Sequence, residues 1–206
     1  YLKSRAALQK EPADFCLVTD GDADRIGGMD GRGNALTTHQ IICLLLEHFL
    51  KNRQETGRVV KALTTTSMVD VMCARHQLPL TVTGVGFKYI CREMLKGDVL
   101  LGFEESGGVG FPKHVPERDG ILAGLMILEM LACEGKPLTK LLKRLTANYG
   151  PHEYGRIDIQ VNDAGTNIRR GPQDLTLREW DTIVDTNLKG CFLCAREVYP
   201  HMVGVG

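Results

Sequence analysis

Three aspartates at alternate positions are the residues of this sequence best suited to chemistry. Asp20, Asp22 and Asp24 follow a short apolar, β-prone run, and Arg25 comes directly after them. Carboxylates at this spacing converge on one point with little rearrangement of a loop, and an oxygen-only ligand set favours Mg²⁺ over zinc. The arginine is well placed to hold a phosphoryl group with two hydrogen bonds. The segment predicts a magnesium and phosphate site, and an acidic surface turn is the alternative.

A calcium-binding EF-hand is the other known loop with aspartates at this spacing, and the sequence excludes it. That loop requires glycine at its sixth position and glutamate at its twelfth. Counted from Asp20, these two positions hold Arg25 and Gly31.

Two further loops carry polar side chains where a strand is expected to end. Glu104 and Ser106 lie in a glycine-rich segment, and their oxygens suit hydrogen bonds with sugar hydroxyls. Lys88 lies at an expected strand-to-helix turn, where its ammonium and the helix N-terminal amides suit an anion. The segment with Glu104 and Ser106 is equally compatible with an ordinary surface turn. Asp119 precedes a long apolar segment and is expected to cap a helix.

The segments around these loops alternate between strand and helix patterns. Strands are predicted at residues 15–19, 59–63, 80–85 and 99–103, and helices at residues 37–50, 68–76, 89–94, 119–133 and 138–149. The segment from residue 20 to about residue 34 is predicted to be loop. This alternation predicts an α/β layer fold with a parallel or mixed sheet, whose functional loops lie at the carboxyl ends of the strands.

Composition and charge exclude several classes of protein. Apolar residues make up 43% of the 206 residues and charged residues 24%, a balance typical of a globular protein with a buried core. The 25 basic side chains cancel the 25 acidic ones, so we expect neither nucleic acid nor membrane as a partner. The apolar stretch at residues 121–128 is far shorter than the roughly 20 residues of a membrane span. Seven scattered cysteines and no secretory leader favour a cytoplasmic protein.

The order of these motifs resembles the α-D-phosphohexomutases, the family of phosphoglucomutase and phosphomannomutase, over roughly the first 150 residues. The resemblance implies that the Asp-x-Asp-x-Asp-Arg loop, matched at residues 20–25, binds magnesium and faces a phosphoserine. It implies that the Gly-x-Glu-x-Ser-Gly loop, matched at residues 102–107, reads the sugar hydroxyls through Glu104 and Ser106. In the family's Gly-Phe-Lys turn, the lysine expected near substrate is Lys88.

The reaction implied by this resemblance is reversible phosphoryl transfer between the 1- and 6-positions of a hexose, through a phosphoserine enzyme and a sugar bisphosphate. Its cofactor is Mg²⁺ and its substrate a phosphorylated hexose. Arg25 and Lys88 are the implied catalytic residues, and both contact substrate together with Glu104 and Ser106. The family's phosphoserine loop, of the Thr-Ala-Ser-His-Asn-Pro type, and its Ser-Gly-Thr phosphate loop are absent from the sequence. We therefore expect a mutase-type site that is incomplete by itself.

The sequence from about residue 157 to residue 206 resembles a different family, the short-chain dehydrogenases. An Asn-Asp-Ala-Gly turn at residues 162–165 is similar to the family's Asn-Asn-Ala-Gly turn, and Asn187 matches an asparagine near its catalytic lysine. The nucleotide-binding glycine turn and the Tyr-x-x-x-Lys pair are absent. A fragment of an NAD(P)-dependent oxidoreductase is the second interpretation of the chain, and a non-catalytic module that binds Mg²⁺ and phosphosugar is the third.

The sequence therefore predicts a chimera of three parts. Residues 1–56 are expected to be the C-terminal part of the second phosphohexomutase domain with the metal loop, and residues 57–150 the third domain with the sugar loop. Residues 151–206 are expected to be the dehydrogenase-like fragment. The predicted fold is a mixed three-layer α/β/α domain with a partial Rossmann-like C-terminal fragment. Because a half domain leaves sheet edges and helix faces uncovered, we expect a complementing chain or an oligomer to cover them.

Overall fold

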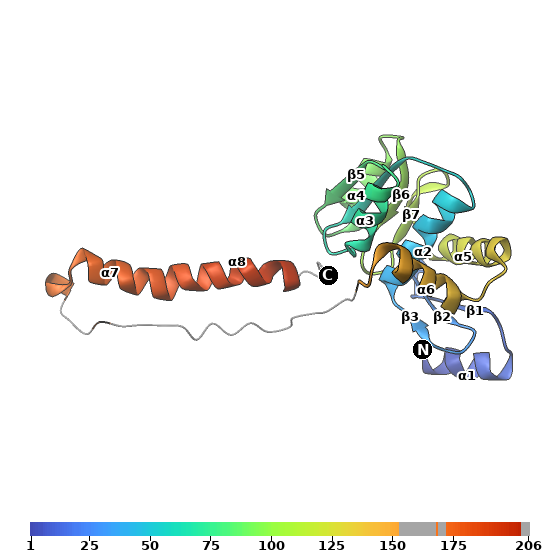
Figure 1. Cartoon of the computed structure of the whole chain (residues 1–206), viewed down its shortest axis with the longest axis horizontal. Helices are drawn as coiled ribbons and strands as arrows, with labels where there is room; N and C mark the ends of the chain where they lie inside the picture. Colours follow the sequence, from blue (N-terminus) through green and yellow to red (C-terminus); the bar gives the residue numbers. More distant parts are fainter. Residues whose placement is uncertain (153–167, 169–171, 203–206) are drawn as a thin grey trace. The chain divides into compact units, whose positions relative to one another are not determined.

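The chain forms two units in the computed structural model, Tyr1–Glu153 and Tyr154–Gly206 (Figure 1). The structure describes residues 1–152, residue 168 and residues 172–202. Unit 1, the first of the two, contains every strand of the described chain and all three loops predicted to carry the chemistry. The predicted boundary after residue 56 falls inside this unit and stays a prediction.

The first sheet of unit 1 is antiparallel, with strand order β1-β2-β3. Its strands are β1 (Phe15–Thr19), β2 (Ile26–Asp30) and β3 (Ala35–Leu36). The prediction of a continuous loop after residue 20 is wrong, because two glycines in β2 conceal its strand pattern. A Cβ atom at Gly28 would lie 2.4 Å from the ring of Phe15, so glycine is required where the aromatic ring crosses the neighbouring strand.

The second sheet is mixed, with strand order β5-β4-β6-β7-β8. Its strands are β4 (Arg58–Ala62), β5 (Leu80–Thr83), β6 (Val99–Phe103), β7 (Val109–Phe111) and β8 (Val115–Arg118). The first three strands in the order are parallel, and β7 and β8 are added antiparallel. The predicted strands at residues 59–63, 80–85 and 99–103 are confirmed. The short strands β7 and β8 fall where no strand was predicted, and they form because β7 pairs with β6 and β8 pairs with β7.

The helices of unit 1 follow the apolar periodicity of the sequence. They are α1 (Leu2–Lys10), α2 (Thr38–Lys51), α3 (Met68–Arg75), α4 (Phe87–Met94), α5 (Gly120–Glu134) and α6 (Leu138–Tyr149). Helix α2 begins at a capping box, in which the Thr37 side chain accepts from the Gln40 amide and the Gln40 side chain accepts from the Thr37 amide. Five of the six helices match predicted segments, and α1 was not predicted.

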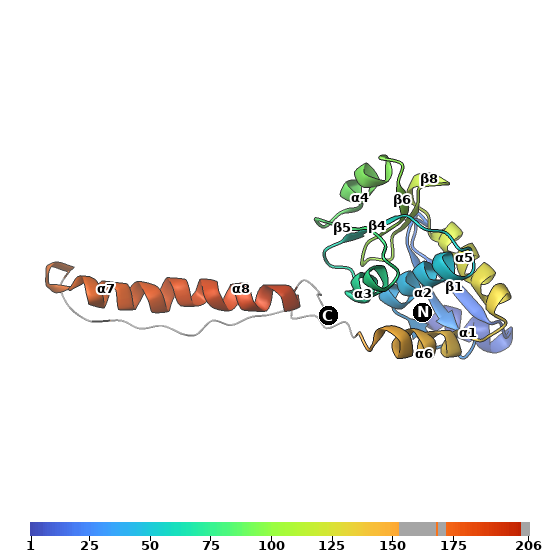
Figure 2. The same cartoon turned by 45° about the horizontal axis from the view of Figure 1, so that its top comes forward.

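Both faces of the second sheet are covered by helices (Figure 2). Successive residues of a strand face opposite sides of a sheet. In β4, the middle one of the three parallel strands, Val59 belongs to the larger apolar core with side chains of α2, α3, α5 and α6. Its neighbour Val60 belongs to a smaller core with Phe87 and Ile90 of α4. This part of unit 1 is therefore the α/β/α arrangement that the sequence predicts.

The described part of unit 2 is helical. It consists of η1 (Pro172–Asp174), α7 (Leu177–Val184), the π-helical turn η2 (Asp185–Lys189) and α8 (Gly190–Met202). Neither α7 nor η2 has a buried residue. The Asn-Asp-Ala-Gly turn at residues 162–165 lies outside the described residues. No helix in the described part of the chain is both long and apolar enough to cross a membrane.

Candidate functional site

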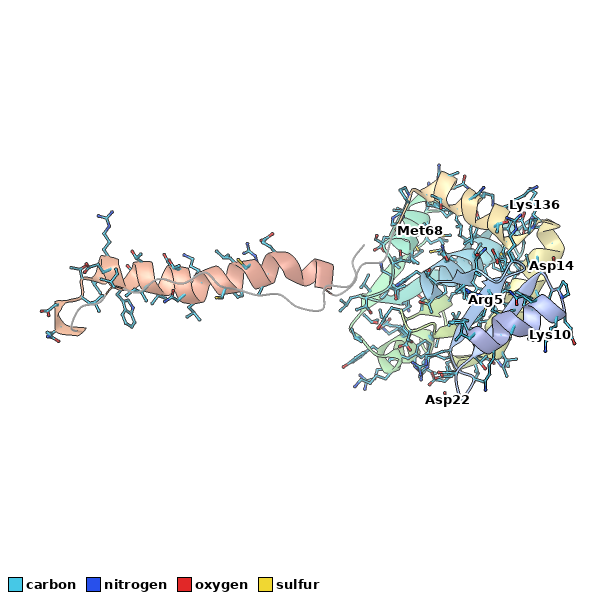
Figure 3. All side chains as sticks on the ribbon, turned by 90° about the horizontal axis from the view of Figure 1, so that it is seen from below. Arg5, Lys10, Asp14, Asp22, Met68 and Lys136 are labelled. Atoms are coloured by element: carbon cyan, nitrogen blue, oxygen red, sulfur yellow. The ribbon has the colours of Figure 1, made fainter. Side chains whose placement is uncertain are left out.

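The aspartate loop connects β1 to β2 and brings its three carboxylates together. Asp20, Asp22 and Asp24 each offer one oxygen, and these oxygens lie within 4.8 Å of one another. The turn is tight, because Ala23 has a φ of 60° and its amide donates to the Asp20 carbonyl at 3.2 Å. Asp22 is exposed at the edge of unit 1 (Figure 3), so the cluster opens to solvent. This is an arrangement that can hold a hard cation.

Arg25 is tied to the first aspartate of the loop. Its Nε lies 2.5 Å from Asp20 Oδ2 and 3.7 Å from Asp24 Oδ1. Desolvation acts to raise the pKa of Asp20, but the hydrogen bonds and charge of Arg25 outweigh it and hold the pKa below its usual value. The Arg25 side chain is 47% exposed, so it remains accessible to an anionic group from solvent.

Asp24 is the most enclosed aspartate of the loop. Its Oδ2 lies 2.6 Å from Nη2 of Arg118, whereas its Oδ1 is buried without a hydrogen-bond partner among the described residues. Desolvation raises the pKa of Asp24, and the charges of Asp22 and Asp20 add to this effect, whereas the charge of Arg118 opposes it. A buried carboxylate oxygen without a partner is costly. A bound cation would supply that partner, so the donor set fits a divalent metal ion.

Arg118, at the end of β8, connects the aspartate loop with the loop after β6. Its Nη2 contacts Asp24, and its Nη1 donates to Glu104 Oε1 at 2.8 Å. Its guanidinium also lies over the Phe87 ring, with Cζ 5.3 Å from the ring centroid. Arg118 is not among the site residues predicted from the sequence. The available signal was a basic side chain directly before the predicted cap Asp119, but only the pairing of β7 with β8 places it here.

The glutamate loop after β6 lies against the aspartate loop. Ser106 Oγ donates to Glu104 Oε1 at 2.6 Å, so the two predicted sugar contacts touch each other. The amide of Ile26 donates to the Gly107 carbonyl at 3.0 Å. Gly107 has a φ of 97°, and a Cβ there would lie 2.5 Å from the Ile26 carbonyl oxygen. Glycine at this position therefore permits the close approach of the two loops.

Lys88 lies in the first turn of α4, after Gly86 with its φ of 117°. Its ammonium is 5.0 Å from the centroid of the Tyr89 ring, and among the described residues it forms no ion pair. The adjacent Phe87 contacts Arg118, so the structure connects this turn to the two loops through the phenylalanine. The catalytic and substrate-binding role of Lys88 stays a prediction.

Asp119 has the capping role predicted for it. Its side chain accepts from the Leu122 amide at 2.7 Å at the start of α5. His114 Nε2 lies 3.3 Å from the other carboxylate oxygen of Asp119. The helix cap therefore fixes the end of the segment that carries Arg118.

Comparison with family models gives two matches. The model described as phosphoglucomutase/phosphomannomutase, alpha/beta/alpha domain III, matches residues 37–149. That range contains the glutamate loop and Arg118, whereas the aspartate loop precedes it. The model described as short chain dehydrogenase matches residues 138–206, so the two matches overlap in α6.

Curated and solved proteins show the same similarity. The chain is 32% identical over 143 residues to the phosphoglucosamine mutase of Corynebacterium efficiens, covering 69% of this chain and 32% of that protein. It is 33% identical over 141 residues to the phosphoglucosamine mutase of Nitratidesulfovibrio vulgaris, covering 68% of this chain and 31% of that protein. The chain thus spans about a third of the length of these curated relatives.

Among solved structures, a putative phosphomannomutase from Thermus thermophilus is similar with 40% identity and a TM-score of 0.71, over 79% of this chain and 37% of that one. The open form of parafusin, a phosphoglucomutase from Paramecium, has 23% identity and a TM-score of 0.63, over 74% of this chain and 28% of that one. The second similarity concerns the fold.

Proposed function

The chain belongs to the phosphoglucomutase/phosphomannomutase family, since the family's domain III model covers more than half of it, and from this premise we propose that unit 1 binds Mg²⁺ and a phosphorylated hexose. The reaction it serves is phosphoryl transfer between the 1- and 6-positions of the sugar. The observation that carries the proposal is the Asp24–Arg118–Glu104 bridge, because it joins the metal loop and the sugar loop in one site.

Asp20, Asp22 and Asp24 would hold the metal ion. Support comes from the convergence of their oxygens and from the buried Asp24 oxygen that has no hydrogen-bond partner among the described residues. A bound Mg²⁺ supplies neutralisation of the charge on phosphoryl oxygens, which is the main requirement of phosphoryl transfer. Arg25, half exposed beside the cluster, adds a donor for the same phosphoryl group.

The sugar would be bound by the glutamate loop. Glu104 and Ser106 already lie within hydrogen-bonding distance of each other, and Arg118 donates to the same carboxylate oxygen of Glu104. Such a preformed set of acceptors and donors suits sugar hydroxyls. The relatives are named for glucosamine and mannose phosphates, so the proposed substrate class is hexose and hexosamine phosphates.

Turnover would need residues from outside this sequence. The 206 residues contain neither a Thr-Ala-Ser-His-Asn-Pro loop nor a Ser-Gly-Thr phosphate loop, so the proposal for these residues is confined to binding. We keep a complementing chain or an oligomer that covers exposed edges among the proposed partners. Binding of metal and phosphosugar is the part of the function that unit 1 can perform alone.

Isothermal titration tests the proposal. Purified chain is titrated first with MgCl₂ and then with glucose 1,6-bisphosphate, beside an Asp22→Ala variant and an Asn187→Ala control in unit 2. Because Asp22 is an exposed ligand candidate, the variant should stay folded but lose detectable Mg²⁺ binding and the bisphosphate binding that depends on it. The control should bind as the original chain does. Absent binding in the original chain, or equal loss in both variants, would contradict the proposal.

Two other functions remain distinguishable by experiment. A non-catalytic binding module would retain Mg²⁺ and phosphosugar affinity, yet give no product when the missing domains are supplied as a second chain. An NAD(P)-dependent oxidoreductase fragment is favoured only by the match at residues 138–206. A chain with this function should bind NADH in a fluorescence titration. The sequence contains neither the nucleotide-binding glycine turn nor the Tyr-x-x-x-Lys pair that such binding and catalysis use.

A further inference from the structure

We propose that Thr64 is a positioning residue of the glutamate loop, and that it acts by holding the Glu105 carboxylate away from the sugar-binding side. The inference rests on the proposed function, because it assigns how the sugar loop obtains its shape. Thr64 lies in the connection after β4, outside the motifs that carry the family resemblance.

The two adjacent glutamates of the loop have different partners. Glu104 accepts from Arg118 and Ser106, on the side of the aspartate loop. The Glu105 carboxylate instead accepts a short hydrogen bond from Thr64 Oγ1, on the side of β4. The Glu105 carbonyl accepts from Thr38 Oγ1 at 2.7 Å, in the first turn of α2. The loop is thus held from two neighbouring elements through one residue.

The surroundings of Glu105 are polar and partly enclosed. Thr64 and Glu105 are both half-buried. The nearby His39 accepts from the Thr66 amide through Nδ1 at 3.2 Å. Desolvation lowers the pKa of His39, and the charge of Glu105 opposes this change, which places the carboxylate near the imidazole. A half-buried carboxylate with a hydroxyl partner is therefore anchored here.

Loss of the anchor would change the sugar side of the loop. A freed Glu105 carboxylate would repel the carboxylate of its neighbour Glu104, since the two charges lie one residue apart. The anchoring hydrogen bond joins the Thr64 hydroxyl to an ionised carboxylate. Removal of a hydrogen bond of this kind changes an equilibrium constant by about tenfold. The aspartate loop contacts neither Thr64 nor Glu105 through any hydrogen bond found in the described residues, so metal binding should not change.

Four proteins distinguish positioning from a general structural role: the original chain, Thr64→Val, Thr64→Ser and Glu105→Gln. Affinity for glucose 1,6-bisphosphate in Mg²⁺ should fall about tenfold in Thr64→Val, with Mg²⁺ affinity unchanged within about twofold. Thr64→Ser keeps the hydroxyl, and Glu105→Gln keeps an oxygen acceptor, so both should bind within about threefold of the original chain. Unchanged binding in Thr64→Val, failure of Thr64→Ser to restore it, or equal loss of Mg²⁺ binding would overturn the inference.

Hydrogen exchange without ligand separates this inference from the proposed function. The amides of Glu104 and Gly107 donate to the carbonyls of Gly108 and Glu104 within the loop. Both amides should exchange about tenfold faster in Thr64→Val than in Thr64→Ser. If the original chain binds no bisphosphate, the proposed function fails, and the exchange rates alone decide the positioning role. Equal rates in the two variants would overturn it.

Discussion

Helix α2 in unit 1 and helix α7 in unit 2 begin with the same local device but differ in what they bury. Each starts at a threonine capping box, Thr37 with Gln40 in α2 and Thr176 with Glu179 in α7. Helix α2 is buried along most of its length, whereas α7 has no buried residue. A capping box therefore defines where a helix begins, and packing partners decide how much stability the helix adds to the fold.

Removal of a core side chain should show the largest difference between the two regions. Leu45 in α2 is fully buried, so Leu45→Ala should lower the free energy of unfolding by about 2–5 kcal/mol. Phe192 in α8 is 62% exposed, so Phe192→Ala should change it by less than about 0.5 kcal/mol. Urea denaturation followed by circular dichroism measures both. A similar loss in the two variants would show that the exposed helix is packed in solution.

Acid should destabilise unit 1 through a carboxylate that has no equivalent among the described residues of unit 2. Hydrogen bonds from Arg144, and then Lys51, lower the pKa of Glu134 to about 2, although desolvation opposes them. A folded-state pKa below the ordinary 4.5 stabilises the fold above pH 4.5, and this stabilisation is lost as the pH falls towards 2. With solvent screening, the contribution is about 2 kcal/mol.

The Glu134→Gln variant isolates this effect. Its stability should fall less steeply than that of the original chain between pH 4.5 and pH 2. Glu197→Gln in α8 is the matched control, because the Glu197 side chain is 72% exposed. The denaturation midpoint of each variant is measured across this pH range. The same pH dependence in both variants would contradict the stabilising role of Glu134.

Loss of a helix cap should give the smallest difference in stability between the two regions. Asp119→Ala removes the acceptor of the Leu122 amide, so the unfolding free energy of unit 1 should fall by about 1 kcal/mol. Thr176→Ala removes the equivalent cap of α7, and it should reduce helical content without moving the unfolding transition of unit 1. Thermal unfolding recorded at 222 nm distinguishes the two results. A shift of the main transition by Thr176→Ala would be the contrary outcome.

Much of the fold follows from local patterns of the sequence. The apolar periodicity predicts α2, α5 and α6 to within a residue or two, because amphipathic helices repeat their apolar side chains at a fixed interval. The parallel strands of the second sheet are predicted from short apolar runs, because a strand covered on both faces carries apolar side chains on both. Strand β2 was missed because the side chains that cover its glycines, including Phe15, come from elsewhere in the chain.

The sequence by itself determined that three carboxylates and an arginine share one turn, and the family resemblance singled out the loop of Glu104 and Ser106. Alternate aspartates in one turn converge through local geometry, and Gly107 permits a backbone conformation that few other residues adopt. The roles predicted for these residues and for Lys88 remain to be tested. Only the tertiary structure decided that Arg118 joins Asp24 to Glu104 and that Thr64 holds Glu105. These contacts join residues far apart in the chain. The residues come together only because the strands that carry them pair, and no local sequence pattern encodes that pairing.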